Sequence, residues 1–149
     1  KEKSYIVPTL CAAGELLHNE TIEGPKALSM QRKNKANLET ILHSLSKAYK
    51  AGLKMGYGTD KGTSYNWHGT NYNELLYRHE YLGIEPIELL LQATRYSALI
   101  IRKDDEIGSI HSGMCADLIA VDDDPIKDIT VMCKTPCFVM KSGQIINCE

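Results

Sequence analysis

The stretch Leu53–Asp60 has the sequence LKMGYGTD, and its interpretation decides the fold. A half-apolar run typical of a β-strand ends at Gly58-Thr59-Asp60, so a carboxylate stands directly after the strand. If the segment is a barrel strand, its C-terminal end is where barrel enzymes carry their catalytic groups. If it is an ordinary strand, Asp60 only caps a turn or the following helix. The flanking sequence has to distinguish these two alternatives.

The segment before this stretch predicts a helix over Asn37–Ala51. Its apolar residues recur at helical spacing and form one stripe, made of Leu38, Ile41, Leu42, Leu45, Ala48 and Tyr49. Gly52 ends the helix, and the strand Leu53–Tyr57 follows at once, as in an α/β unit. Farther upstream, Tyr5–Leu10 predicts a second strand. Residues 11–36 have some helical character at first and then predict a loop and a short helix, with Gly24-Pro25 as a break.

The segment after the stretch begins with a loop over residues 58–71, which is rich in Gly and Asn. Two further helices are predicted over Tyr72–Leu82 and Pro86–Leu99, the first with Asn71 and Glu74 as a capping box.

The chain changes character after Ile101. EIGSIHSG, MCADLIAVD and TVMCKTPCFVMKSGQIINC predict short strands separated by turns, with a hairpin at Ser142-Gly143. We therefore expect an α/β part over residues 1–104 and an antiparallel β part over residues 105–149.

Length and charge exclude several classes of protein. The 149 residues suit one domain, and a formal net charge of −2 provides no basic surface for nucleic acid. No apolar run reaches the roughly 18 residues that a membrane span needs. We expect neither nucleic acid nor a membrane as a partner. The chain starts KEKSYIVPTL, without Met, which indicates a piece of a longer protein, although processing would also explain it.

The five cysteines are an odd number without a tight spacing framework. This pattern favours buried free thiols in a reducing cytoplasm over disulfides. Cys133 and Cys137 could form half of a zinc site, but no matching His/Cys pair stands nearby in the sequence. His18, His43, His79 and His111 do not pair at metal-ligand spacing either.

Several segments together resemble one family. AGLKMGYGTDKG is followed by HGTNYNELLYRHEYLGIEPIELLLQAT, then by IGSIHSGMCADLIAVDDDPIKDI and VMKSGQII. This order is similar to the C-terminal part of metal-dependent amidohydrolases, in the branch of imidazolonepropionase and the prolidase-like Xaa-Pro or Xaa-Arg dipeptidases. The resemblance covers residues 5–148. It implies an α/β fold: strands seven and eight of a (β/α)8 barrel, with residues from about 105 onward contributing to a small β-sandwich.

The resemblance also implies a chemistry. In the family, the carboxylate at the Asp60 position ligates a catalytic divalent metal, typically zinc, takes a proton from the attacking water and passes it to the leaving nitrogen. His68 corresponds to a loop position that can contact substrate, while a helix-capping or loop-packing role is the alternative. Tyr65 could line the pocket or face solvent. The expected activity is hydrolysis of an amide or peptide C–N bond, with dipeptide cleavage favoured over cyclic-amide opening and deamination.

The sequence lacks the rest of the implied site. In the family the other ligands come from an HxH motif and from earlier strands, and this chain contains no HxH. A full barrel needs roughly 250 residues. The chain is therefore expected to be inactive alone and to associate as an oligomer or with a complementary N-terminal chain. The alternative is a non-catalytic remnant that binds or assembles without turnover. The sequence identifies neither the substrate nor the number of metal ions.

Overall fold

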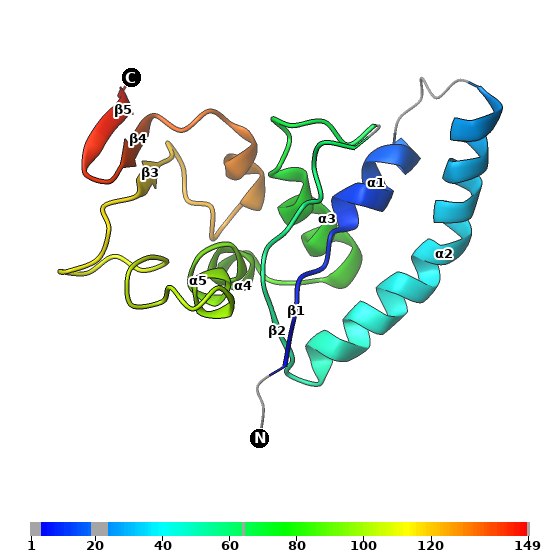
Figure 1. The fold of residues 1–149 in the computed structure, drawn as a ribbon, viewed down its shortest axis with the longest axis horizontal. Helices are drawn as coiled ribbons and strands as arrows, with labels where there is room; N and C mark the ends of the chain where they lie inside the picture. The colour runs from blue at the N-terminus through cyan, green and yellow to red at the C-terminus, as the bar shows by residue number, and fades with distance from the viewer. Residues whose placement is uncertain (1–3, 19–23, 64, 149) are drawn as a thin grey trace.

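The computed structural model describes residues 4–18, 24–63 and 65–148 of the chain. It is a mixed α/β structure in which two parallel strands stand between helices, followed by a small antiparallel sheet (Figure 1). The elements are, in chain order, β1 (Tyr5–Ile6), α1 (Leu10–His18), α2 (Pro25–Lys50), β2 (Lys54–Met55), α3 (Asn73–Leu82), α4 (Pro86–Leu91), a π-helical turn (Gln92–Tyr96), α5 (Ser97–Ile100), β3 (Leu118–Ala120), a 3₁₀ helix (Ile129–Cys133), β4 (Phe138–Lys141) and β5 (Gln144–Cys148).

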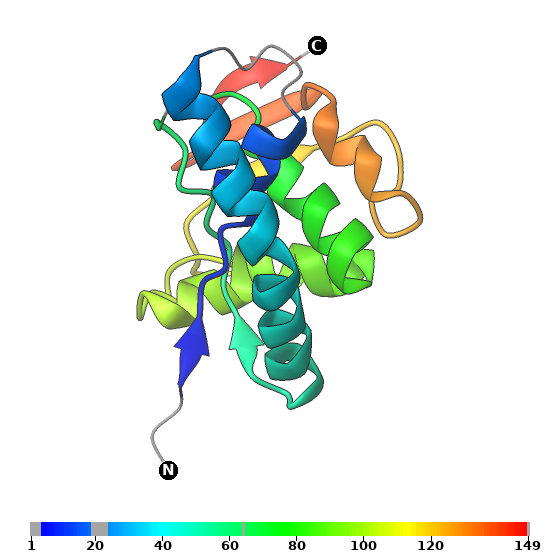
Figure 2. The same cartoon turned by 90° about the vertical axis from the view of Figure 1, so that its right-hand side faces the viewer.

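The parallel pair β1–β2 organises the N-terminal two thirds of the chain. Tyr5 pairs with Lys54 and Ile6 with Met55, and the N–H of Gly56 donates to the carbonyl of Ile6 at 2.9 Å. The connection between the strands contains α1 and α2, which lie together on one side of the pair (Figure 1 and Figure 2). Because the strands are parallel, their C-terminal ends lie at the same edge, and the segments that follow Ile6 and Met55 meet there.

Helix α2 is longer than the sequence predicts. It begins at Pro25 and ends at Lys50, whereas the apolar stripe predicted a start at Asn37 and a loop with a short helix before it. Pro25 stands in the first turn, where its missing N–H has no partner to lose, so the Gly24-Pro25 pair starts the helix instead of breaking one. Similarly, the helical character after Leu10 is a complete helix, α1, and it replaces the end of the predicted strand Tyr5–Leu10.

Helix α3 agrees with its predicted span but not with its predicted cap. Its N-terminus has no side-chain cap, and the Glu74 carboxylate instead accepts from the backbone N–H of Cys11 at 2.8 Å. The predicted helix over Pro86–Leu99 is present as α4 and α5, joined by the π-helical turn. At the start of α5, Ser97 Oγ donates to the carbonyl of Gln92 in the turn at 2.7 Å and accepts from the N–H of Tyr57 at 2.9 Å. The turn therefore links the helix to the residues just after β2.

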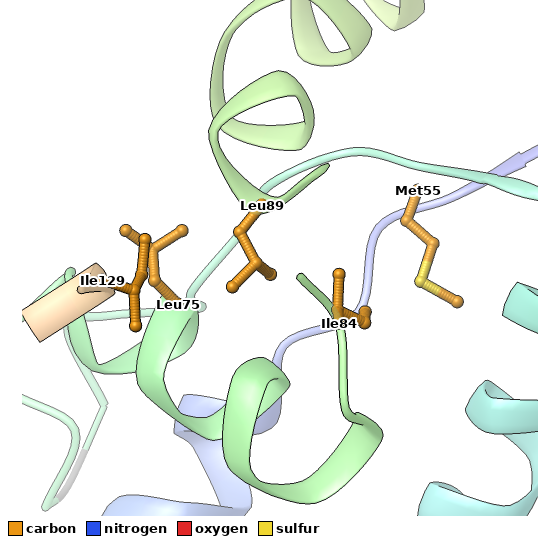
Figure 3. Close-up of a cluster of buried hydrophobic side chains, with 5 residues drawn as sticks. All are labelled: Met55, Leu75, Ile84, Leu89 and Ile129. Atoms are coloured by element: carbon orange, nitrogen blue, oxygen red, sulfur yellow. The ribbon is translucent and has the colours of Figure 1, made fainter. Parts of the chain in front are cut away.

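The main apolar core forms where the helices meet β2. Met55, Leu75, Ile84, Leu89 and Ile129 are almost completely buried and pack together (Figure 3). Full burial of one such side chain contributes roughly 1.5–3 kcal/mol. A second cluster, Leu10, Cys11 and Tyr77, joins α1 to α3. Ile129 comes from the C-terminal part, so this part shares the main core with the helices.

The C-terminal sheet has the order β3-β4-β5 and is antiparallel. The predicted hairpin is confirmed, because Lys141 pairs with Gln144 around a turn at Ser142-Gly143. Two other predictions were wrong: residues 106–113 form turns, and Ile129–Cys133 forms a 3₁₀ helix that begins with the Asp128 carboxylate accepting from the N–H of Thr130. Gly and Ser in the first segment favour turns, and Asp128 provides a cap in the second.

In the described part of the chain, no helix combines the length and the apolar character that crossing a membrane would require. The cysteine prediction is partly wrong. Cys11 is a buried free thiol, whereas Cys115 is a free thiol on the surface. Burial and the neighbouring Glu74 carboxylate raise the pKa of the Cys11 thiol to about 12, so it stays protonated and acts as a small apolar side chain.

Candidate functional site at the strand ends

Asp60 lies in the loop that leaves the C-terminal end of β2. We call residues 58–71 the Asp60 loop. The backbone of Asp60 has a φ of 51°, in the left-handed region, and the residue is exposed. Across the residues that the structure describes, the Asp60 carboxylate forms neither a hydrogen bond nor an ion pair. Among the described residues, this side chain accepts from no backbone N–H, so it caps neither a turn nor a helix there. The carboxylate is therefore available to a ligand.

The Asp60 loop is held from within by Asn66, which is 1% exposed. Its Nδ2 donates to the carbonyls of Thr59 at 3.0 Å and Asp60 at 2.6 Å. Its backbone N–H donates to the carbonyl of Thr63 at 3.1 Å, and its carbonyl accepts from the N–H of Gly62 at 2.8 Å. One residue therefore bonds to four positions of the loop. Sequence reasoning missed Asn66, because an Asn in a Gly-rich loop has no periodic signal.

A second anchor ties the loop to the helices. Lys61 Nζ donates to Glu15 of α1 at 2.8 Å and to Thr70 Oγ1 at 2.7 Å, and its side chain is only 2% exposed. Asn73, at the start of α3, donates to the same Glu15 oxygen at 2.6 Å. The residue directly after Asp60 is thus fixed to α1, which fixes the loop relative to both strand ends.

His68 and Tyr65 both lie in this loop, as the sequence predicts, in different surroundings. His68 is exposed, and its Nε2 lies 3.0 Å from the place that a Cβ on Gly62 would occupy. Tyr65 is half-buried and has a φ of 65°. The His68 ring therefore lies next to Gly62, which follows Asp60 by two residues. The contact of either side chain with a substrate stays a prediction.

Three buried polar side chains at the strand ends form what we call the strand-end cluster: Glu74, Arg78 and Gln92, each with 0% exposure. Arg78 donates to Glu74 at 2.7 Å and to Gln92 Oε1 at 2.8 Å. Its guanidinium also donates to the carbonyl of Pro8, after β1, at 2.7 Å and to that of Gly56, after β2, at 2.8 Å. A single planar group therefore sets the distance between the two strand ends.

The charges of this cluster form a completely buried ion pair between Glu74 and Arg78. Burial raises the pKa of Glu74 above its ordinary value, and the Arg78 guanidinium and the Cys11 N–H act in the opposite direction. Burial also raises the pKa of the neighbouring Tyr57 phenol, which donates to the carbonyl of Asn71. Neither group is free to exchange protons with a ligand. The cluster serves the structure of the strand ends, whereas Asp60 remains open.

The donor set for a metal ion is incomplete in the described residues. Asp60 fits the part of one ligand, because it is an exposed, unpaired carboxylate on a fixed backbone. However, no three His, Cys, Asp or Glu side chains gather into a metal-binding group within the described ranges, Cys133 and Cys137 included. His79 belongs to no such group either, and its Nδ1 lies 2.9 Å from the carbonyl of Ile84.

Comparisons with known proteins agree on one family. The model of the Amidohydrolase family matches residues 5–146. Ochratoxinase from Aspergillus niger is 30% identical over 113 residues, which are 74% of this chain and 24% of that protein. Among solved structures, a Xaa-Pro dipeptidase with bound methionine in the active site has a TM-score of 0.83 at 34% identity, covering 97% of this chain and 34% of the other.

A second solved structure extends this agreement. A prolidase complexed with N-methylphosphonate-L-proline has a TM-score of 0.72 at 28% identity, covering 99% of this chain and 36% of the other. The chain therefore spans about a quarter of the curated relative and about a third of the solved structures.

Proposed function

Because the chain belongs to the amidohydrolase family, we propose that it is part of a metal-dependent hydrolase that cleaves an amide or peptide C–N bond. The observation that carries this proposal is the Asp60 carboxylate, exposed and unpaired among the described residues, at the end of a parallel strand pair. Chemistry at the C-terminal ends of parallel strands is typical of barrel enzymes.

A dipeptide-like substrate is favoured within this class. Two solved neighbours are a Xaa-Pro dipeptidase and a prolidase complexed with a phosphonate derivative of proline. We propose a small dipeptide with a C-terminal carboxylate as the first substrate to test, with cyclic amides next. His68 and Tyr65, on the same loop as Asp60, are the proposed substrate contacts.

We further propose that β1 and β2 are strands seven and eight of a (β/α)8 barrel. Their parallel pairing and the βαβ connection support this assignment. Residues 105–149, with the β3-β4-β5 sheet, are proposed as the C-terminal share of a β-sandwich. The remaining strands and the other ligands would come from outside this chain.

The proposed reaction needs two actions from Asp60. Its carboxylate would hold one position of the metal site, and it would carry a proton from the attacking water to the leaving amine nitrogen. The chemistry that a divalent metal, with zinc as the first candidate, would supply when bound is polarisation of the amide carbonyl and hydroxide near neutral pH. Asn66 and Lys61 fix the loop, so the carboxylate does not have to be ordered when substrate arrives.

The test uses the protein at its natural length, purified with Zn²⁺. We expect release of free amino acids from Xaa-Pro dipeptides, and we expect Asp60→Asn to lower kcat by at least about 10³-fold, the order of loss for a residue of a catalytic unit. Asp104→Asn is the matched control, since Asp104 is also exposed but lies in the turn after α5, and it should keep full activity. Unchanged turnover in Asp60→Asn would refute the proposal.

The alternative is a non-catalytic remnant or assembly module of the same fold. It is favoured by the incomplete donor set in the described residues. In both proposals the outer edges of the β1–β2 sheet need partners, because the sheet has only two strands among the described residues. Further strands of a longer protein would cover these edges, and so would a second chain. We propose an oligomer or a complementary N-terminal chain, and light scattering that gives a monodisperse monomer would argue against it.

A further inference from the structure

We propose that Asn66 is a positioning residue for Asp60, which holds the backbone of the reacting carboxylate in its left-handed conformation. This inference rests on the proposed function, because it takes Asp60 as the carboxylate that binds metal and carries the proton. Asn66 was not among the predicted site residues. Its effect on Zn²⁺ binding and kcat can be measured separately from that of Asp60.

The first observation is the direction of the Asn66 amide. Its Nδ2 lies 3.0 Å from the carbonyl oxygen of Thr59 and 2.6 Å from that of Asp60, so both carbonyls accept from the same NH₂ group. The reversed amide would place an oxygen against two carbonyl oxygens, so the two contacts decide the orientation. The amide therefore fastens the peptide units on both sides of the Asp60 Cα.

The second observation is the strain at Asp60. Its φ of 51° lies in the left-handed region, which a non-glycine residue adopts at an energetic cost that its surroundings must offset. Two hydrogen bonds from a side chain that is 1% exposed provide that restraint. Asp60 thus combines a restrained backbone with a carboxylate that is free of partners among the described residues, as expected for a preorganised ligand.

The third observation separates Asn66 from the general support of the loop. Lys61 anchors the loop independently to Glu15 and Thr70. Removing the Asn66 amide would leave this anchor in place and release mainly Thr59 and Asp60. The Oδ1 atom of Asn66 is buried and accepts no hydrogen bond from the described residues, so the amide binds through its donors alone.

The experiment compares Asn66→Leu, which has nearly the same shape but no donor, with Asn71→Leu in the protein at its natural length. Asn71 is exposed in the same loop, and its side chain has no hydrogen bond in the described structure. Zn²⁺ affinity by chelator competition, kcat and KM on an Xaa-Pro dipeptide, and the melting temperature are measured for each. A group that orients a metal ligand contributes about 10–100-fold to metal affinity or activity.

We expect Asn66→Leu to weaken Zn²⁺ binding and to lower kcat within that range, with KM changed less than kcat and Asn71→Leu unchanged. Adding Asn66→Leu to Asp60→Asn should weaken Zn²⁺ binding no further, because Asn66 acts through the carboxylate. If Asn66→Leu does not fold, Asn66→Ser, which keeps one donor, should show a smaller loss of the same kind.

Three results would overturn the inference, and they are distinguishable. If either folded variant keeps wild-type kcat and Zn²⁺ affinity while Asp60→Asn loses both, Asn66 does not position Asp60, and the proposed function stands. If Asp60→Asn itself keeps kcat and Zn²⁺ affinity, the proposed function fails and the inference fails with it. An additive loss in the double variant also contradicts the inference, because Asn66 would then act independently of the carboxylate.

Discussion

The strand-end cluster and the Asp60 loop are two polar regions at the same edge of the β1–β2 pair, and they differ in how their polar groups are used. In the cluster, the Arg78 guanidinium is bonded to Glu74, to Gln92 and to two strand-end carbonyls, and no side chain reaches solvent. In the loop, Asp60 and His68 are exposed, and the hydrogen bonds of Asn66 fix the backbone at Asp60.

This difference indicates how the edge is built. Bonded, buried charges hold the two strand ends at a set distance, and they have no capacity left for a ligand. Exposed charges on a fixed backbone keep that capacity. The hydrogen-bond partners of a charge, more than its place in the chain, therefore separate a structural carboxylate such as Glu74 from a candidate catalytic one such as Asp60.

The largest effect on stability is expected from Arg78→Met. Removing one partner of a buried ion pair leaves the other charge uncompensated, which costs about 3–5 kcal/mol. It would also leave the carbonyls of Pro8 and Gly56 without their donor. We expect a loss of this size in the free energy of unfolding, measured by urea denaturation, or a failure to accumulate as folded protein.

The matched control is Arg95→Met, at an exposed position of the π-helical turn. It removes the same charge without breaking a buried network, so its effect should stay within about 0.5 kcal/mol. Equal stabilities of the two variants would show that the strand-end cluster does not hold the strands.

A smaller effect is expected from Gly62→Ala in the Asp60 loop. Gly62 has a φ of 104°, which an L side chain rarely adopts, and the added Cβ would lie 3.0 Å from His68 Nε2. We expect the strained backbone to lower the free energy of unfolding by about 1–3 kcal/mol. We also expect the His68 ring to be displaced, which would be seen as a shift of its NMR signals.

Gly113→Ala separates these two contributions. Gly113 has a similar φ of 94°, is far from His68 in the sequence, and an added Cβ there would have no atom outside its chain neighbours within 4 Å. It should lose stability in the same way and leave His68 in place. If both variants shift the His68 signals equally, the ring is not held against Gly62, and its place in the loop is less defined than that of Asp60.

The sequence predicted well the parts of the fold that local chemistry determines. The spans of α3 and of the helical run from Pro86, and the hairpin turn at Ser142-Gly143, follow from periodicity, Pro, Gly and turn residues. The start of α2 was wrong, because basic residues without an apolar stripe gave no sign that the helix reaches back to Pro25. Long helices with an exposed half lack the pattern on which such a prediction depends.

The candidate site was predictable only in part, for a related reason. Asp60, His68 and Tyr65 lie in one loop, which sequence order alone indicates. The restraints on that loop were not predictable, because Asn66 acts through its tertiary contacts. Glu74 was misread as a capping residue because local spacing favoured it, while its partner is the N–H of Cys11, 63 residues away. The i, i+4 pair of Glu74 and Arg78 on an otherwise apolar helix face was the available signal.

The smallest effect on stability is expected from the exposed ion pair of Asp117 and Lys141. Asp117 accepts from Lys141 Nζ and from the backbone N–H of Ser142 at 2.7 Å, and so ties the start of the β3 segment to the hairpin turn. These two donors hold the pKa of Asp117 below its ordinary value. Because the folded-state pKa is depressed, the stabilisation is present above the unfolded pKa and is lost as the pH falls through the folded one.

Asp117→Asn should therefore lower the melting temperature slightly at pH 7 and make no difference in strong acid, where both proteins lack the charge. The effect should also shrink in high salt, since exposed pairs are screened, whereas the effect of Arg78→Met should persist. Thermal unfolding at several pH values and two salt concentrations measures this. A salt-independent loss as large as that of Arg78→Met would contradict the distinction between buried, mutually bonded charges and charges that remain open to solvent.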